Sequence, residues 1–245
     1  MKKLALLLYF LPTTVLFAQE IYWWNPANSE FDVIEGQAWP NVVEQTYDRL
    51  PKEAKEKVRS SVWNLSKHSA GLMIRFRSNA SEIKVRYGTH WDRENPKVDF
   101  GMNHMPATGV SGVDLYAIDP DGKELWVTGQ RSFGDTIIYN FNGIRPNDAY
   151  HNLGREYRLY LPLYSQVDWL EIGTEDSTFF KPLAVRKDKP IVVYGTSIAH
   201  GATASRPGMA WTSILSRKID RPLINLGFSG NVRLEPEVID FMSDI

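Results

Sequence analysis

Two short apolar runs in the last third of the chain decide the fold: Pro190-Ile191-Val192-Val193-Tyr194 and Pro222-Leu223-Ile224-Asn225-Leu226. Nearly continuous apolar runs of this length are typical of strands covered on both faces in a parallel sheet. A glycine-rich turn follows each run, and residues 209–219 and the segment from Glu235 onward have helical patterns. The order strand, turn, helix, repeated twice, predicts the first part of a doubly wound, flavodoxin-like α/β sheet over residues 189–245.

Residues 20–188 have a different pattern, dominated by short strands. Residues 82–87 alternate strictly between polar and apolar, and residues 72–77 alternate partly, so both are predicted as half-buried strands. The polar residues 78–81 between them predict a hairpin, and Asp119-Pro120-Asp121-Gly122 is a second turn signal. Further strands are predicted at 113–118, 124–128, 136–141, 157–161 and 167–172.

The fold class predicted from these two regions is α+β with two domains. An antiparallel, jelly-roll-like β-sandwich (residues 20–188) precedes the α/β part (residues 189–245). Residues 51–60 are the exception in the first region. Their charges at i,i+4 spacing and Pro51 at the start predict a solvated surface helix.

The first 19 residues are typical of a secretory signal peptide. Lys2 and Lys3 precede the apolar residues 4–10, and Leu16-Phe17-Ala18-Gln19 offers a cleavage site with a small residue. The mature protein is therefore expected to begin at Gln19 or Glu20 and to be secreted or periplasmic. A membrane anchor is the weaker interpretation, because Thr13 and Thr14 interrupt a run already shorter than the roughly 20 apolar residues of a span.

Composition excludes several functions. Lys and Arg number 28 against 29 Asp and Glu, so no basic surplus indicates nucleic acid as a partner. The absence of cysteine excludes disulfides and thiol nucleophiles. Eight tryptophans favour a β-rich core, a sugar-facing surface, or both. Burial in the core is the favoured interpretation of the tryptophans, and six are candidates for sugar stacking instead: Trp23, Trp24, Trp63, Trp91, Trp126 and Trp169. Trp91 is the first to test, since it lies in a predicted loop.

The α/β region is short for an independent unit. Two parallel strands leave unprotected edges, and a domain of this kind needs on the order of 100 residues. The sequence is therefore expected to stop within its second domain. The alternative is that the short α/β piece packs against the sandwich.

Chemistry is expected on the loop after the first apolar run, Gly195-Thr196-Ser197-Ile198. In a doubly wound sheet, ligands bind beyond the carboxyl ends of the strands, where a serine can attack and free N–H groups can hold an oxyanion. A phosphate loop is excluded, because no Gly-Lys-Ser/Thr follows. Position alone leaves two roles open for Ser197, nucleophile or helix cap.

The loop resembles the first motif of the SGNH (GDSL-type) hydrolases. Ala204-Ser205-Arg206-Pro207-Gly208-Met209-Ala210 and Asn225-Leu226-Gly227-Phe228-Ser229-Gly230-Asn231 extend the resemblance, and Gly112-Val113-Asp114-Leu115-Tyr116 is similar to the GxDLY signature of a secreted branch with an N-terminal sandwich. The resemblance implies that Ser197 is the nucleophile. It also implies that the Gly230 N–H helps to form the oxyanion hole, with Gly227 as the alternative.

Two departures from the family pattern bear on activity. Thr196 stands where the family has Asp, and between Asn231 and Ile245 the sequence contains neither the family's C-terminal Asp-x-x-His motif nor its oxyanion-hole Asn. The resemblance therefore implies that this chain alone has little or no esterase activity, because no residue is assigned as the base. His200, three residues after Ser197, is expected to line the crevice or lie on the surface and not to act as the base.

Weaker candidates for substrate binding are His90, Trp91, His104 and His200. Of these, His90 and His104 lie in one aromatic and glycine-rich stretch. The two histidines could instead form a metal pair with Asp92 or Asp99, but the spacing matches no known site, so no metal and no cofactor are predicted.

Two functions of different classes follow. The first is a secreted serine ester hydrolase that removes an acyl or acetyl group from a carbohydrate or small metabolite, with no nucleic-acid partner and no stable membrane insertion. The second is a carbohydrate-binding or docking sandwich without catalysis. An Asp-x-x-His motif in the continuing sequence would favour the first.

Overall fold

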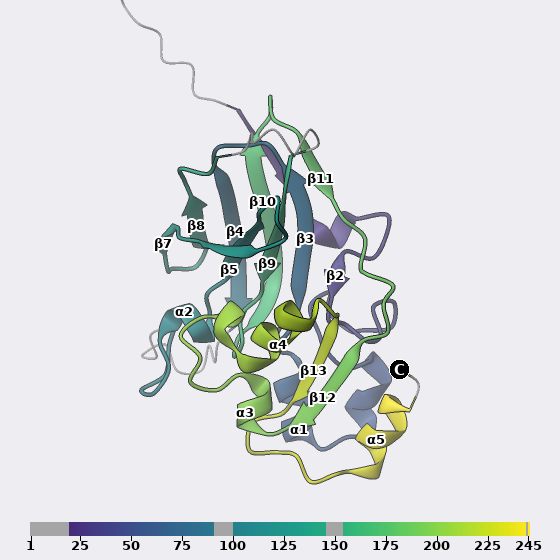
Figure 1. Ribbon diagram of the computed structural model, residues 1–245. Helices are drawn as coiled ribbons and strands as arrows, with labels where there is room; N and C mark the ends of the chain where they lie inside the picture. Colours follow the sequence, from purple (N-terminus) through teal and green to yellow (C-terminus); the bar gives the residue numbers. More distant parts are fainter. Residues whose placement is uncertain (1–19, 91–99, 146–153, 244) are drawn as a thin grey trace, which may run out of the picture.

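The computed structural model describes residues 20–90, 100–145, 154–243 and 245. Most of its strands form two antiparallel sheets (Figure 1). One sheet has the order β1 (Ile21–Trp24), β10 (Gln166–Glu175), β4 (Ile83–His90), β8 (Ile137–Phe141) and β7 (Gln130–Ser132). The other has the order β11 (Phe180–Pro182), β3 (Met73–Ser78), β9 (Arg155–Tyr160), β5 (Asp114–Ile118) and β6 (Glu124–Val127), and β2 (Ile34–Glu35) also pairs with β3.

The two sheets enclose one hydrophobic core. Ile83, Val85 and Tyr87 of β4 face it together with Ile74 and Phe76 of β3, and all five are fully buried. Successive strand residues point to opposite faces, so the alternation in residues 82–87 places every second side chain in this core. The prediction of a half-buried strand here is confirmed.

The predicted hairpin between β3 and β4 is wrong. The two strands lie in different sheets, and the chain crosses from one sheet to the other between them. Ala80 is fully buried at this corner, and its N–H donates a hydrogen bond to Ser78 Oγ (3.0 Å). The β5–β6 hairpin is confirmed: Gly122 has a φ of +79° and donates its N–H to the Asp119 carbonyl (2.8 Å).

The predicted surface helix over residues 51–60 is confirmed only in part. A 3-10 helix covers Lys52–Glu56, and the α-helix α1 follows it over Ser60–Ser66. Ala54 and Val58 are buried in a second core, together with residues of α1 and of the C-terminal region. The charged residues indicated a solvated face, but the apolar positions among them pack inward.

The C-terminal region contains a parallel strand pair, as predicted. β12 (Ile191–Gly195) and β13 (Leu223–Gly227) pair in register, with Gly195 opposite Gly227. The order of the elements around them is α3 (Ser197–His200), a 3-10 helix (Pro207–Met209), α4 (Trp211–Ile219) and, after β13, α5 (Pro236–Met242). β13 is buried along its length whereas β12 is only half-buried, so the expectation that both strands are covered on both faces holds for β13 alone.

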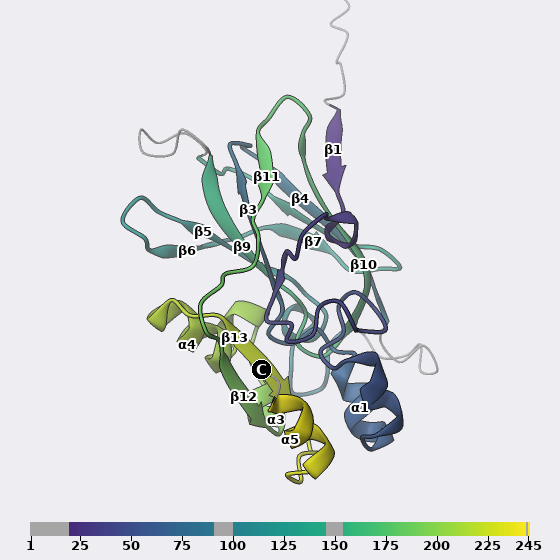
Figure 2. The same ribbon diagram turned by 90° about the vertical axis from the view of Figure 1, so that its right-hand side faces the viewer.

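Helices distant in sequence pack together on this pair. Val62 and Trp63 of α1 share the second core with Val238 and Phe241 of α5 and with Leu226 of β13. Figure 2 shows α1, α5 and the strand pair at the same end of the molecule. The remaining short helices are 3-10 helix Pro26–Asn28 and α2 (Ala107–Val110). Among the described residues, no helix has the length and apolar character to cross a membrane.

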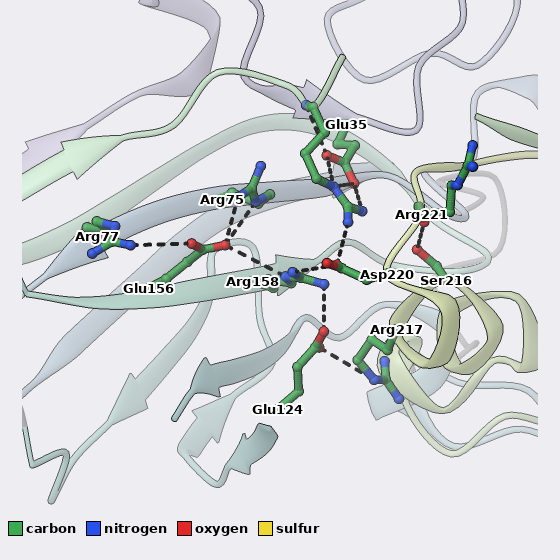
Figure 3. A network of polar contacts seen from close by, with 11 residues as sticks. Glu35, Arg75, Arg77, Glu124, Glu156, Arg158, Ser216, Arg217, Asp220 and Arg221 are labelled. Carbon is green, nitrogen blue, oxygen red and sulfur yellow. Dashed lines mark hydrogen bonds and ion pairs between the residues drawn. The ribbon is translucent and has the colours of Figure 1, made fainter. Parts of the chain in front are cut away.

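A network of ion pairs fastens α4 to one sheet (Figure 3). Arg158 of β9 contacts Glu124 (2.6 Å) and Asp220 (3.2 Å), and Asp220 follows the last residue of α4. Arg186 contacts the same Asp220 (2.8 Å), and Arg217 of α4 contacts Glu124 (3.6 Å). These arginine side chains are mostly buried, so the network holds α4 in one orientation against β6 and β9.

The Gly112–Tyr116 segment makes a second attachment between the same regions. Asp114 of β5 is buried, and its carboxylate accepts hydrogen bonds from the Gly208 N–H (3.0 Å) and from Trp126 Nε1 (2.7 Å). Arg206 forms an ion pair with the same carboxylate at 3.0 Å. Asp114 therefore joins a strand of the sandwich to the residues that lead into α4.

Candidate active site

Ser197 is the first residue of α3 and follows β12 after a single intervening residue. Its side chain is partly exposed, and its hydroxyl makes no hydrogen bond with any residue that the structure describes. The position that caps the helix is Thr196, whose side chain makes no capping bond. The capping role left open by the sequence therefore has no support in the geometry, and the hydroxyl of Ser197 is free to react.

The second predicted motif lies on the neighbouring loop. Because β12 and β13 are parallel, the loops that follow them meet at one edge of the sheet, where the Phe228 N–H donates to the Gly195 carbonyl (2.8 Å). Gly230 is exposed at the tip of its loop, with a φ of +69°. Within the described part of the chain, the Gly230 N–H has no hydrogen-bond acceptor, so it is available to a ligand.

Gly227, the alternative oxyanion donor, has another role. Its N–H donates to Asn225 Oδ1 (2.8 Å), and a Cβ on it would lie 2.2 Å from the His200 backbone nitrogen. Asn225 is itself buried and donates from Nδ2 to the Ala199 carbonyl (2.8 Å). Gly227 thus allows α3 to approach β13 closely, and Gly230 remains the candidate for the oxyanion hole.

Tyr164 connects the two loops, and no sequence motif pointed to it. Its hydroxyl lies 3.3 Å from Ser229 Oγ and 3.5 Å from the carbonyl oxygen of Ser197. These contacts span 33 and 65 residues of sequence, so local patterns carry no signal for them. Tyr164 ties the loop of Ser197 to the loop of Gly230.

His200 is fully buried, which corrects the expectation that it lines a crevice or lies on the surface. Its ring stacks on Tyr164, with centroids 4.2 Å apart and planes 9° apart. Nε2 lies 2.8 Å from the Leu163 carbonyl, and Nδ1 accepts a hydrogen bond from the Ser229 N–H (3.3 Å). This pairing requires the neutral tautomer with the proton on Nε2.

The surroundings keep His200 neutral. Burial and then the neighbouring Arg49 guanidinium and His68 lower the pKa of His200 well below 6.5. Both ring nitrogens are committed to other groups, so the side chain is not placed to take the Ser197 proton. The ring instead holds the Ser229 amide, and with it the start of the Gly230 loop.

Arg49 also supports the loop that carries Gly230. The guanidinium is almost completely buried and donates to four carbonyl groups, those of Leu65 (2.6 Å), His68 (2.6 Å), Asn225 (2.9 Å) and Gly227 (2.8 Å). Burial lowers the pKa of Arg49 to about 9. Arg49 therefore fixes the end of β13, where the loop begins.

The other weaker sequence candidates do not join this group in the described structure. His104 is exposed beside the Met102–Met105 bridge, and His90 is the last residue of β4. Trp91, Asp92 and Asp99 lie outside the described residues. No group of three or more metal-binding side chains occurs in the part of the chain that is described.

Five of the six candidate tryptophans lie in the described structure. Trp23 is half-buried, and the Arg86 guanidinium lies 4.0 Å from the centroid of its ring. Trp63 is buried in the second core, and Trp24 packs partly buried against the larger core. Trp126 and Trp169 are exposed by 50% and 37%. The core interpretation therefore fits Trp63 and Trp24, and the surface interpretation stays open for Trp126 and Trp169.

A sandwich joined to a parallel strand pair, with a free serine hydroxyl and a free glycine amide on adjacent loops, is typical of a serine-type acyl hydrolase. Residues 21–180 match the family model GxDLY, described as the N-terminus of SGNH hydrolase-type esterases. Residues 188–245 match the GDSL-like lipase/acylhydrolase family. The chain belongs to the SGNH (GDSL-like) hydrolases with a GxDLY N-terminal region, so the resemblance seen in the sequence is confirmed.

Solved structures agree with this assignment. A candidate GDSL-like lipase from Bacteroides ovatus ATCC 8483 is 29% identical, with a TM-score of 0.78 over 92% of this chain and 62% of its own. The salicylyl-acyltransferase SsfX3 from a tetracycline biosynthetic pathway is 18% identical, with a TM-score of 0.66, and shows the shared fold. The chain spans 62% and 59% of the lengths of these two proteins. No curated protein sequence matches it.

Proposed function

We propose that this protein is a secreted or periplasmic ester hydrolase that removes an acyl or acetyl group from a carbohydrate or small metabolite. The observation that carries the proposal is the pairing of Ser197, whose hydroxyl is unbonded, with Gly230, whose amide is unbonded, at one edge of the β12–β13 pair. Membership of the GDSL-like family supports ester hydrolysis as the reaction class.

The proposed reaction has two covalent steps. Ser197 Oγ attacks the ester carbonyl carbon while its proton passes to a base, and the carbonyl electrons move to oxygen. The N–H groups of Ser197 and Gly230 donate hydrogen bonds to this oxyanion. The oxyanion then collapses, the protonated alcohol leaves, and an acyl-serine remains. Water attacks the acyl-serine in the same way, which releases the carboxylic acid and restores Ser197.

The base is proposed to come from residues outside the described structure, as the family's Asp-x-x-His motif would supply it. His200 stacks on Tyr164, and the His68 ring lies tilted against both of these rings. Desolvation also lowers the pKa of His68, to about 3. A missing general base typically costs about 10²- to 10⁴-fold in rate. This chain by itself is therefore expected to hydrolyse esters poorly.

The domain division is part of the same proposal. Residues 20–188 would form the sandwich domain, and residues 189–245 the opening part of a flavodoxin-like domain. The proposed domain boundary does not separate all contacts. Helix α1 belongs to the first region of the sequence but packs against β13 and α5 of the second. Residues 1–19 would act as the signal peptide. The partners proposed are small-molecule or carbohydrate esters.

A direct test compares two proteins: this chain, and a version extended through an Asp-x-x-His motif. The extended protein should hydrolyse p-nitrophenyl acetate, and this chain should hydrolyse it at least about 10²-fold more slowly. Ser197→Ala in the extended protein should abolish turnover with an unchanged melting temperature. Hydrolysis retained in a folded Ser197→Ala variant would exclude the proposal and favour the non-catalytic binding module.

A further inference from the structure

The loop that carries Gly230 is held by single hydrogen bonds, because no helix or strand covers residues 228–235. Before Gly230, the Ser229 N–H donates to His200 Nδ1 (3.3 Å). After it, the Asn231 N–H donates back to the Phe228 carbonyl (2.9 Å). The unbonded N–H of Gly230 lies between these two anchors, so its direction depends on how the neighbouring groups are held.

The Asn231 side chain holds the peptide unit that contains the Gly230 N–H. Asn231 Nδ2 donates a hydrogen bond to the Ser229 carbonyl oxygen (2.8 Å). This carbonyl and the Gly230 N–H belong to one planar trans peptide unit, in which they point in opposite directions. A bond that fixes the carbonyl therefore also fixes the direction of the N–H. Gly230 itself adds no support, since even a Cβ built on it would have no neighbour within 4 Å.

Arg59 holds Asn231 in turn. Its guanidinium donates to Asn231 Oδ1 from Nη1 (3.3 Å) and to the Asn231 backbone carbonyl from Nη2. Arg59 directly precedes α1, and its own carbonyl accepts the Trp63 N–H (3.0 Å). Because α1 packs in the second core, the backbone of Arg59 is a fixed base for this contact. Asn231 is thus held by a residue 172 positions earlier in the sequence.

Glu235 keeps the Arg59 guanidinium in this orientation. Its Oε1 accepts from Arg59 Nε (2.9 Å), and its Oε2 accepts from the Tyr194 hydroxyl (2.8 Å) and from the Arg233 N–H (3.0 Å). Burial opposes the charge of Glu235, but the hydrogen bonds from Arg59 and from the Arg233 N–H lower its pKa to about 2. The carboxylate is therefore ionised at neutral pH, and hydrogen bonds between charged groups are stronger than neutral ones.

We infer that Asn231 and Arg59 are positioning residues that aim the Gly230 N–H at the oxyanion. The inference rests on the proposed function, in which this N–H stabilises the transition state. Asn231 acts on the peptide unit directly, and Arg59 acts through Asn231. Arg59 lies in the region that matches the GxDLY model, so that region supports the proposed active site in addition to forming the sandwich.

Hydrogen exchange of this chain, measured by mass spectrometry, tests the support itself. Residues 228–235 should exchange several-fold faster in Asn231→Ala and in Arg59→Ala than in the unmodified chain, because the loop loses its side-chain anchors. Arg86→Ala removes another half-buried, ion-paired arginine (2.6 Å from Glu171) and should leave the exchange of this loop unchanged. Unchanged exchange in folded Asn231→Ala and Arg59→Ala variants would overturn the inference, whether or not the protein is a hydrolase.

Kinetics of the extended protein test the role in catalysis. Loss of an oxyanion donor typically lowers kcat about 10²- to 10³-fold, so a misdirected donor should cost less. Asn231→Ala should lower kcat for p-nitrophenyl acetate about 30-fold and Arg59→Ala about tenfold, with KM changed less than about twofold. Because Arg59 acts through Asn231, the double variant should lose no more activity than Asn231→Ala alone. Arg86→Ala should keep the kcat of the parent protein.

Two kinetic results would overturn the inference while leaving the proposed function intact. One is an unchanged kcat in Asn231→Ala when Ser197→Ala is inactive. The other is a double variant whose losses multiply to about 300-fold, as expected of two residues that act independently on stability or activity. Hydrolysis retained in a folded Ser197→Ala variant would instead refute the proposed function, and the inference would fail with it.

Discussion

Substitution of His200 by glutamine tests whether the candidate active site rests on a buried, neutral imidazole. His200 is fully buried, its Nε2 faces the Leu163 carbonyl, and its Nδ1 accepts the Ser229 N–H. Glutamine offers a donor and an acceptor of similar reach but does not titrate. His200→Gln should therefore change how stability depends on pH, in addition to any loss at neutral pH.

The sign of the change follows from the direction of the pKa shift. The pKa of His200 in the folded protein lies well below 6.5, whereas an unfolded histidine titrates near 6.5. Between pH 7 and pH 5 the unfolded state gains a proton at this position and the folded state does not. Folding stability falls as the pH is lowered, by about 2 kcal/mol from this residue at pH 5.

Urea unfolding at pH 7, 6 and 5 measures the effect. The unmodified chain should lose about 2 kcal/mol more stability than His200→Gln over this interval. His104→Gln, at an exposed histidine, is the matched control and should keep the pH dependence of the unmodified chain. Equal slopes for the unmodified chain and His200→Gln would refute the assignment of a buried neutral ring.

Four further substitutions test the two loops and the residues that support them. Gly227→Ala should lower the free energy of unfolding in urea by more than about 2 kcal/mol, because its Cβ would lie 2.2 Å from the His200 backbone nitrogen. Gly230→Ala should lower it by only about 1 kcal/mol, because the only cost is the positive φ. Equal losses for the two variants would contradict this difference. Arg49→Met removes the guanidinium that donates to four carbonyls, two of them in buried contacts, and should cost at least about 3 kcal/mol. A melting temperature near that of the unmodified chain would argue against this role. Tyr164→Phe in an extended, active protein should lower kcat about fivefold with little change in melting temperature, and an unchanged kcat would show that the link between the loops is dispensable.

Local patterns predicted most of the strands. The alternation in residues 82–87 marks a strand with one buried face, and the apolar runs that became β12 and β13 indicate a parallel pair. The pairing of strands could not be predicted in this way, because alternation shows which face of a strand is buried and not which strand lies beside it. The prediction of a β3–β4 hairpin was wrong for this reason. A short turn can join two neighbouring strands of one sheet, but it can also lead the chain from one sheet to the other, as it does here.

The proposed reacting groups and the residues that support them differ in how far the sequence could predict them. Ser197 and Gly230 lie on loops that directly follow predicted strands, so topology and motif indicated them together. The burial of His200 depends on Leu163 and Ser229, which are 37 and 29 residues away. Arg49 reaches partners up to 178 residues away. Such contacts arise from tertiary packing, and no local pattern of charge or hydrophobicity encodes them.

Ser197 is proposed to be the nucleophile of an acyl-transfer site, and covalent labelling tests this role. The most direct measurement treats the extended protein with a fluorophosphonate ester and identifies the modified peptide by mass spectrometry. One adduct should form, on Ser197, and Ser197→Ala should form none while it melts like the parent protein. An adduct on a different serine, or undiminished labelling in a folded Ser197→Ala variant, would contradict the claim.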